Sequence, residues 1–274
     1  MNLKGMVNHF DRLDGGFKSA QFQDFELRTA FQPVYAVSGE IGVLYGVEAL
    51  VRPLQAGKSI QPLDFFAMLD KPDAFAADWV CLTLHLANAA AWHLKGTSLF
   101  VNLNPDASHR VKDMASGFDA YVRLADDLGI SAERLIIEIT ERRAGCDDGL
   151  ASLVRHIKSL GCKVAVDDFG IEGSNLARVV ALQPDIVKID RIWFNAMMRD
   201  TASRSLVKAV ASRVQGMGAK VVFEGVETAE EFNWARECGA DLIQGWLFGK
   251  ATYADEEPSD HCVRTPANDV LKAG

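Results

Sequence analysis

Residues 163–168 read KVAVDD, a short apolar run containing two valines that ends in two consecutive aspartates. Such a run is typical of a buried β-strand whose polar end reaches the edge of a sheet. Comparable runs recur along the chain, and most of them also end in a polar residue. We expect strands at residues 31–37, 45–52, 99–103, 135–140, 163–166, 186–189, 220–223 and 242–248.

The segments between these strands decide how the strands pair. The first two are separated only by residues 38–44, which favours an antiparallel hairpin. The later intervals are long enough for a crossover helix, which favours parallel pairing. Helical patterns fall at residues 62–69, 79–93, 149–160, 203–216 and 229–238, the last with Thr228 as its N-cap.

This order predicts an α/β fold, a (β/α)₈ TIM-like barrel with one antiparallel strand near the start. An open doubly wound sheet is the alternative, but no phosphate-loop or dinucleotide glycine motif follows any strand. We expect an N-terminal extension at residues 1–24, the barrel domain at 25–252 and a flexible C-terminal tail at 253–274. The tail is polar and contains proline.

Composition limits the class of protein. The formal net charge is −8, which argues against a nucleic acid polymer as partner. The 5 cysteines are scattered and none forms a CxxC pair, which favours a reducing compartment. The first residues lack the apolar run of a signal peptide, and no stretch suggests membrane insertion. A cytoplasmic location is therefore expected.

Polar side chains at the ends of several predicted strands carry the chemistry. They are Glu48, Asn102, Glu138, Asp167, Asp168, Lys188, Glu224 and Gln244. Residues at the carboxyl ends of barrel strands converge on one site. Ionised carboxylates crowded there would repel one another by several kcal/mol per close pair at an effective dielectric constant of about 20. The site therefore needs cations.

The residue types indicate which cations. All-oxygen ligands without a nearby Cys or His favour Mg²⁺ or Mn²⁺ over zinc. The adjacent Asp167 and Asp168 suit two ions with one carboxylate bridging them, as in two-metal phosphoryl transfer.

Eight short motifs resemble one known family. They are FQPVY (31–35), GVEALVR (46–52), VNLN (101–104), IIEITE (136–141), VAVDDFG (164–170), PDIVKID (184–190), EGVET (224–228) and QGWLFGK (244–250). In order and spacing they resemble the EAL-domain cyclic di-GMP phosphodiesterases over roughly residues 25–250. The resemblance implies metal-dependent hydrolysis of cyclic di-GMP to linear pGpG with two Mg²⁺ or Mn²⁺ ions.

The resemblance also implies a role for each matching residue. The implied metal ligands are Glu48, Asn102, Glu138, Asp167, Asp168 and Glu224. The implied catalytic residues are Lys188, Glu224 and Glu48, and the implied substrate contacts are Gln32, Arg52, Gln244 and Glu227. A homodimer is common in the resembling family, and a regulatory protein partner is the other interaction we expect.

One segment departs from the family pattern. Residues Ile171, Glu172 and Gly173 stand where the family usually has Thr-Gly-Tyr, although the loop's usual partner glutamate is present as Glu141. This departure keeps open an alternative, a catalytically weak or inactive domain that binds cyclic di-GMP or a protein. The residue chemistry alone also fits a metal-dependent barrel enzyme that abstracts a proton beside a carboxylate, but the paired aspartates favour two metals.

Overall fold

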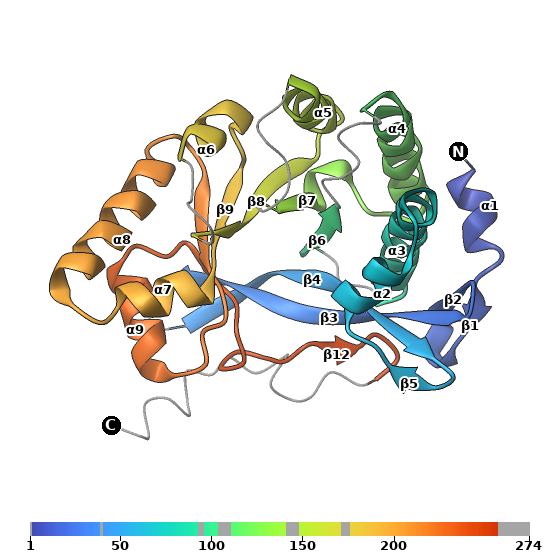
Figure 1. Cartoon of the computed structure of the whole chain (residues 1–274), viewed down its shortest axis with the longest axis horizontal. Helices are drawn as coiled ribbons and strands as arrows, with labels where there is room; N and C mark the ends of the chain where they lie inside the picture. The colour runs from blue at the N-terminus through green and yellow to red at the C-terminus, as the bar shows by residue number, and fades with distance from the viewer. Residues whose placement is uncertain are drawn as a thin grey trace.

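The computed structural model describes residues 2–38, 41–92, 96–103, 111–140, 148–170 and 176–256. In this part of the chain, eight strands close into a barrel (Figure 1). They are β3 (Phe25–Ser38), β4 (Ile41–Gln55), β6 (Ser98–Leu103), β7 (Leu135–Thr140), β8 (Lys163–Phe169), β9 (Ile186–Ile189), β10 (Lys220–Phe223) and β11 (Leu242–Ile243). The predicted barrel is confirmed.

The long strand β3 is antiparallel to both of its barrel neighbours, β4 and β11. The remaining barrel neighbours pair in parallel, as their helical crossovers require. The predicted single antiparallel strand near the start is therefore confirmed. Four short strands extend the sheet, namely β1 (Asp11–Arg12), β2 (Lys18–Phe22), β5 (Lys58–Ser59) and β12 (Thr252–Tyr253).

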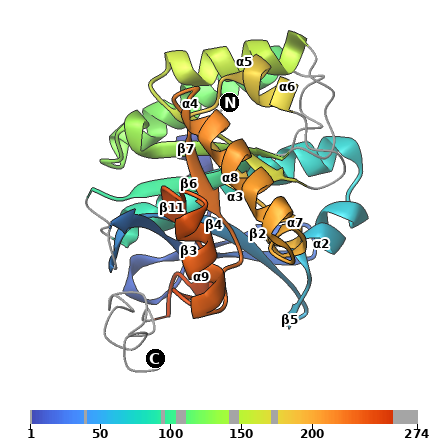
Figure 2. The ribbon, with the colours of Figure 1, turned by 90° about the vertical axis from the view of Figure 1, so that its left-hand side faces the viewer.

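Helices lie around the outside of the strands (Figures 1 and 2). They are α1 (Leu3–Val7), α2 (Pro62–Met68), α3 (Lys71–Ala91), α4 (Val111–Asp127), α5 (Asp148–Ser159), α6 (Leu176–Leu182), α7 (Arg191–Met197), α8 (Thr201–Gln215) and α9 (Ala229–Glu237). Among the described residues, 3₁₀ turns span Asp14–Gly16 and Ala132–Arg134. Thr228 caps α9 through a capping box with Glu231, as the sequence predicts for the N-cap.

Several predicted boundaries were wrong. Strand β3 begins at Phe25 rather than at residue 31, and β4 spans Ile41–Gln55 rather than residues 45–52. Helix α3 begins at Lys71 rather than at residue 79, because Asp70 caps it by accepting a hydrogen bond from Asp73 N. Strand β11 ends at Ile243 rather than at residue 248. The chain turns there, since Phe248 N and Gly249 N both donate to Gly245 O.

The core has an outer and an inner part. Outside the barrel, one apolar cluster packs the sheet against α3, α4 and α5, and a second packs it against α7, α8 and α9. Inside the barrel a smaller cluster comprises Val34, Phe100, Ile136, Ala165, Ile186, Val222 and Leu242. This inner cluster is the floor of the site described below.

Within the described residues, α3 alone is long and apolar enough to cross a membrane, by length and composition only. Of its 18-residue apolar window, 67% is buried inside the structure. Buried core helices commonly have this composition, so α3 is weak evidence for a membrane span.

Candidate active site

A polar layer lies directly on the apolar floor of the barrel. A strand directs every second side chain to the same face, so the residue two positions after a floor residue also points inward. In β6 to β11 that step leads from the floor to Asn102, Glu138, Asp167, Lys188, Glu224 and Gln244. In β4 the same position is held by Glu48, two residues after Gly46. The strand period thus gathers these side chains at the carboxyl end of the barrel.

Lys188 stands at the centre of this layer and is only 1% exposed. Its Nζ lies 2.7 Å from Glu138 Oε1, 2.7 Å from Glu224 Oε1, 3.2 Å from Asp167 Oδ1 and 3.5 Å from Glu48 Oε2. One ammonium therefore faces four carboxylates that arrive from four different strand ends.

Two amides complete the surroundings of Glu48. Asn102 Nδ2 donates to Glu48 Oε1 at 3.1 Å, and Gln244 Nε2 donates to Glu48 Oε2 at 2.7 Å. Each amide nitrogen is thereby directed at the carboxylate. Gln244 Oε1 and Glu138 Oε2 are buried and have no hydrogen-bond partner among the described residues. These oxygens are free to accept a further cation or donor.

Burial and charge shift the pKa values in opposite directions across the site. Burial raises the pKa of Glu138 well above its usual value, and the neighbouring charge of Glu48 adds to this effect. Burial and the charge of Asp167 do the same for the pKa of Glu224. For Glu48, burial is outweighed by Lys188 and the two amides, so its pKa is lowered.

The Lys188 pKa is raised, because the surrounding carboxylates outweigh the effect of burial. Lys188 is therefore a permanent cation at neutral pH. One positive charge does not balance Glu48, Glu138, Asp167 and Glu224, and the raised pKa values of two of them express that imbalance.

A β-bulge in β8 contains the two consecutive aspartates, Asp167 and Asp168. In β8 the register with β9 shifts between Val166 and Phe169, so Asp167 and Asp168 together oppose Lys188. Asp168 has a φ of 59°, in the left-handed region that non-glycine residues rarely adopt. The chain thus accepts local strain where it places two consecutive carboxylates at the barrel mouth.

The residues present fit a hard divalent metal. The site combines carboxylate and amide oxygens, excludes sulfur and imidazole among the described residues, and carries excess negative charge. No three Asp, Glu, His or Cys side chains within the described ranges form a ready metal-binding group. The carboxylates converge on the Lys188 ammonium instead.

Three of the predicted substrate contacts lie around this centre. Gln244 belongs to the polar layer itself. Gln32 opposes Glu48 in the β3–β4 register and donates from Nε2 to Gly249 O at 3.3 Å. Arg52 is half-buried and donates from Nη1 to Val51 O at 3.0 Å. Burial lowers the Arg52 pKa, and the charges of Tyr253 and Glu48 act against this.

Glu227 is separate from the Lys188 cluster in its contacts. Its carboxylate accepts hydrogen bonds from both terminal nitrogens of Arg191. The sequence analysis did not single out Arg191. The available signal was position, since Arg191 directly follows the PDIVKID motif. The altered loop Ile171, Glu172 and Gly173 and its expected partner Glu141 lie outside the described residues.

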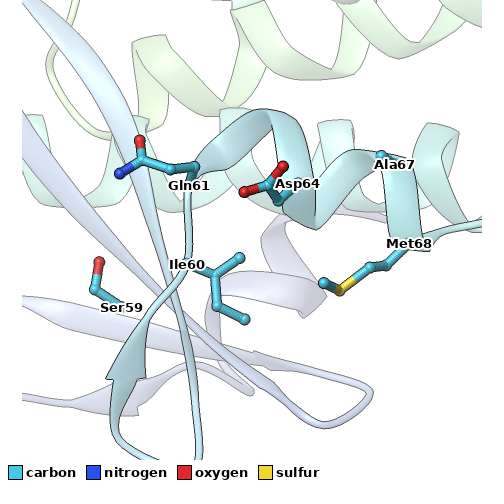
Figure 3. A pocket seen from close by; sticks show the side chains of 6 residues that line it. All are labelled: Ser59, Ile60, Gln61, Asp64, Ala67 and Met68. Atoms are coloured by element: carbon cyan, nitrogen blue, oxygen red, sulfur yellow. The ribbon is translucent and has the colours of Figure 1, made fainter.

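A cavity of about 460 Å³ lies beside α2 (Figure 3). Its lining is Ser59, Ile60, Gln61, Asp64, Ala67 and Met68, and it includes none of the predicted site residues. With one carboxylate and no cationic side chain in its lining, this cavity offers no counterpart to the charge cluster in the barrel. The barrel mouth is therefore the candidate active site.

Comparison with known proteins agrees with the geometry. Residues 18–251 match the EAL domain family. The cyclic di-GMP phosphodiesterase PdeR of Escherichia coli is 30% identical over 242 residues, which cover 87% of this chain and 36% of PdeR. The chain spans only about a third of the length of PdeR and of two other similar proteins, between 28% and 36%.

Two solved structures with bound cyclic di-GMP have the same fold. The manganese/cy-diGMP complex of Klebsiella pneumoniae BlrP1 has a TM-score of 0.74 and 26% identity, covering 86% of this chain and 59% of BlrP1. The c-di-GMP bound form of a standalone EAL protein from Vibrio cholerae has a TM-score of 0.73 and 26% identity, covering 88% of this chain and 99% of that protein. With the family match over most of its length, the chain belongs to the EAL domain family.

Proposed function

We propose that the chain is a metal-dependent phosphodiesterase that hydrolyses cyclic di-GMP to linear pGpG with Mg²⁺ or Mn²⁺. The observation that carries this proposal is the buried cluster of four carboxylates around Lys188 at the mouth of an EAL domain barrel. The substrate class comes from two relatives: PdeR is a cyclic di-GMP phosphodiesterase, and BlrP1 was solved as a complex with cyclic di-GMP.

We assign the residues of the site to two groups, metal ligands and substrate-binding residues. Glu48, Asn102, Glu138 and Asp167 would hold one ion, and Asp167, Asp168 and Glu224 would hold a second. Bound ions would supply Lewis acidity toward the phosphodiester and a template for the displacement. The chain itself supplies a water-poor pocket, because Glu138 and Lys188 are almost completely buried.

Lys188 provides a permanent positive charge in the site. Its ammonium is held by ion pairs with four carboxylates, above the apolar floor to which Ile186 and Val222 belong. In the proposed reaction Lys188 would hold the attacking water by a hydrogen bond and stabilise charge that develops on the phosphoryl group.

The substrate is held from the β3–β4 side. Arg52 presents a planar guanidinium, which suits two-point recognition of a phosphate. Gln32 and Gln244 flank Glu48 and can accept or donate hydrogen bonds to the nucleotide. Arg52 remains charged, since even a lowered arginine pKa stays far above neutral.

The test is incubation of the purified chain with cyclic di-GMP and Mn²⁺, with the product identified by chromatography. We expect pGpG from the wild type and none from Glu48→Gln or Lys188→Met. Lys158→Met, which removes an ion pair with Asp185, is the control and should leave turnover unchanged. Tight binding of cyclic di-GMP without pGpG over hours would assign the receptor function instead.

A further inference from the structure

Arg191 and Glu227 form a two-point ion pair beside the site. Arg191 Nη2 donates to Glu227 Oε2 at 2.7 Å, and Nη1 donates to Glu227 Oε1. Arg191 is the first residue of α7, and it follows strand β9, which carries Lys188. Glu227 lies in the loop after β10, three residues beyond Glu224. The pair therefore ties together the chain segments that bear Lys188 and Glu224.

The backbone of the same loop is fixed by a second contact. Glu231 Oε2 accepts from the backbone nitrogens of Glu227 at 2.7 Å and Thr228 at 3.0 Å. The other oxygen of Glu231 accepts from Asn195 Nδ2 at 3.0 Å. Asn195 lies one helical turn after Arg191 on α7, so side chains of α7 contact the start of α9 at two places.

The aliphatic part of Arg191 also contacts the loop. Gly225 has a φ of 61°, and a Cβ atom at this position would lie 2.6 to 2.9 Å from the Arg191 side chain. Only glycine leaves room for the arginine to pass. Gly225 directly follows Glu224, so the arginine stem rests on the backbone that aims this carboxylate.

We infer that the Arg191–Glu227 pair is a positioning device that holds Glu224 at its 2.7 Å distance from Lys188. This inference rests on the proposed function, because it gives Glu224 its part in holding a metal ion. The two paired side chains are 39% and 27% exposed, so solvent and salt screen the attraction between their charges. The value of the pair is therefore its geometry, which two parallel hydrogen bonds fix.

This role differs from the substrate contact that the family resemblance implies for Glu227. In this structure both oxygens of Glu227 accept hydrogen bonds from Arg191, an interaction that a substrate contact does not require. A positioning role predicts that loss of either partner has the same effect. A substrate contact predicts that only Glu227 matters and that substrate affinity falls.

The experiment is a double-mutant cycle with Arg191→Met, Glu227→Gln and the double variant. Methionine retains an unbranched stem over Gly225, and glutamine retains the shape of glutamate. We expect each single variant to lower kcat by about tenfold or more, as misplaced catalytic groups do, with KM changed by less than about threefold. The double variant should be no slower than the slower single variant, because the pair acts as one unit.

Lys158→Met is the matched control. Lys158 and Asp185 form an ion pair of similar exposure, 34% and 33%, at the opposite end of the same strand β9. This variant should retain the kcat and KM of the wild type. Arg191→Lys, which keeps the charge but loses the second hydrogen bond, should fall between wild type and Arg191→Met.

A calorimetric titration with Mn²⁺ gives a second readout that does not depend on turnover. Arg191→Met and Glu227→Gln should both weaken Mn²⁺ binding several-fold, and Lys158→Met should not. If the wild type shows no hydrolysis, the proposed function fails while this titration still tests the positioning device. Wild-type Mn²⁺ affinity in both variants, or a raised KM at unchanged kcat in Glu227→Gln alone, would overturn the inference.

Discussion

Lys188 Nζ lies 2.7 Å from Glu138 Oε1 at the centre of the barrel, where the two residues are 1% and 0% exposed. Burial of an ion pair costs desolvation energy that the mutual attraction offsets only in part. Here three more carboxylates surround the same ammonium, so the cluster carries excess negative charge. Such a cluster is poorly suited to stabilising the fold and well suited to binding cations.

Divalent metal should stabilise the wild-type chain. We expect Mn²⁺ at one hundred times its dissociation constant to add about 2.7 kcal/mol to the free energy of unfolding. Glu138→Gln should lose most of this gain, because it removes a central carboxylate. Thermal unfolding in EDTA and in Mn²⁺ measures both values. Equal stabilisation of wild type and variant by Mn²⁺ would show that the ion binds elsewhere.

The stability of the metal-free chain should depend on pH through Glu138. Its folded pKa is raised above 4.5, so the folded state holds the proton more tightly than the unfolded state does. That contribution is complete below pH 4.5 and is lost as the pH rises through the folded pKa. In EDTA, Glu138→Gln should therefore gain stability relative to wild type as pH rises. Urea unfolding at several pH values measures this difference, and a difference that is constant with pH would contradict the assignment.

Asp168 offers a way to separate backbone strain from ligand chemistry. Its φ of 59° favours glycine or asparagine over alanine. Asp168→Ala should lower the free energy of unfolding in EDTA by about 1 kcal/mol, whereas Asp168→Gly should not. Both variants should weaken Mn²⁺ binding equally, since both lack the carboxylate. Equal stability of the alanine and glycine variants would argue that the strain is relieved elsewhere.

Gly245 is required by a close approach of two loops. A Cβ atom there would lie 2.1 Å from Val226 O and 2.2 Å from Val226 N. Val226 N also donates to Gln244 O at 3.0 Å, so a forced separation would move both Gln244 and the loop of Glu224. Gly245→Ala should cost about 1–3 kcal/mol of stability and also reduce turnover.

Gly216→Ala is the control for this substitution. Gly216 has an ordinary right-handed backbone at the end of α8, and its nearest Cβ neighbour would be 3.3 Å away. We expect this variant to have a free energy of unfolding and a turnover rate close to those of the wild type, as measured by chemical unfolding and steady-state kinetics. A stable and active Gly245→Ala protein would mean that the two loops can move apart without consequence.

His85 should stay neutral well below its usual pKa. Asn88 Nδ2 donates to Thr29 Oγ1 at 3.0 Å, and Thr29 Oγ1 lies 2.8 Å from His85 Nδ1. We expect the Thr29 hydroxyl to be the donor in this second hydrogen bond. Burial, with a smaller effect from the charge of Arg52, lowers the His85 pKa from 6.5 to about 3. Its contribution to stability is complete above pH 6.5 and is lost as the pH falls toward about 3.

Nitrogen NMR should detect an Nε2–H tautomer for His85 from pH 7 down to pH 5. Thr29→Val should destroy the preference for this tautomer, because valine cannot donate to Nδ1. A protonated His85 at pH 5 in the folded chain would contradict the assignment.

The sequence by itself determined the eight strands of the barrel and which of their residues point inward, but not the four short strands that extend the sheet. The two-residue period of a strand connects Ile136 with Glu138 and Ile186 with Lys188, so an apolar floor and a polar layer follow from residue order alone. The hairpin and the crossover intervals likewise implied a barrel. These are local properties, which neighbouring residues in the chain encode.

Tertiary structure alone decided which side chains meet. That Lys188 faces four carboxylates depends on barrel closure and on the register between strands, which no single segment encodes. For the same reason the sequence did not predict that β11 ends at Ile243 or that Arg191 pairs with Glu227. Contacts between distant segments arise from packing the whole chain, and periodicity fixes a side chain's face but never its partner.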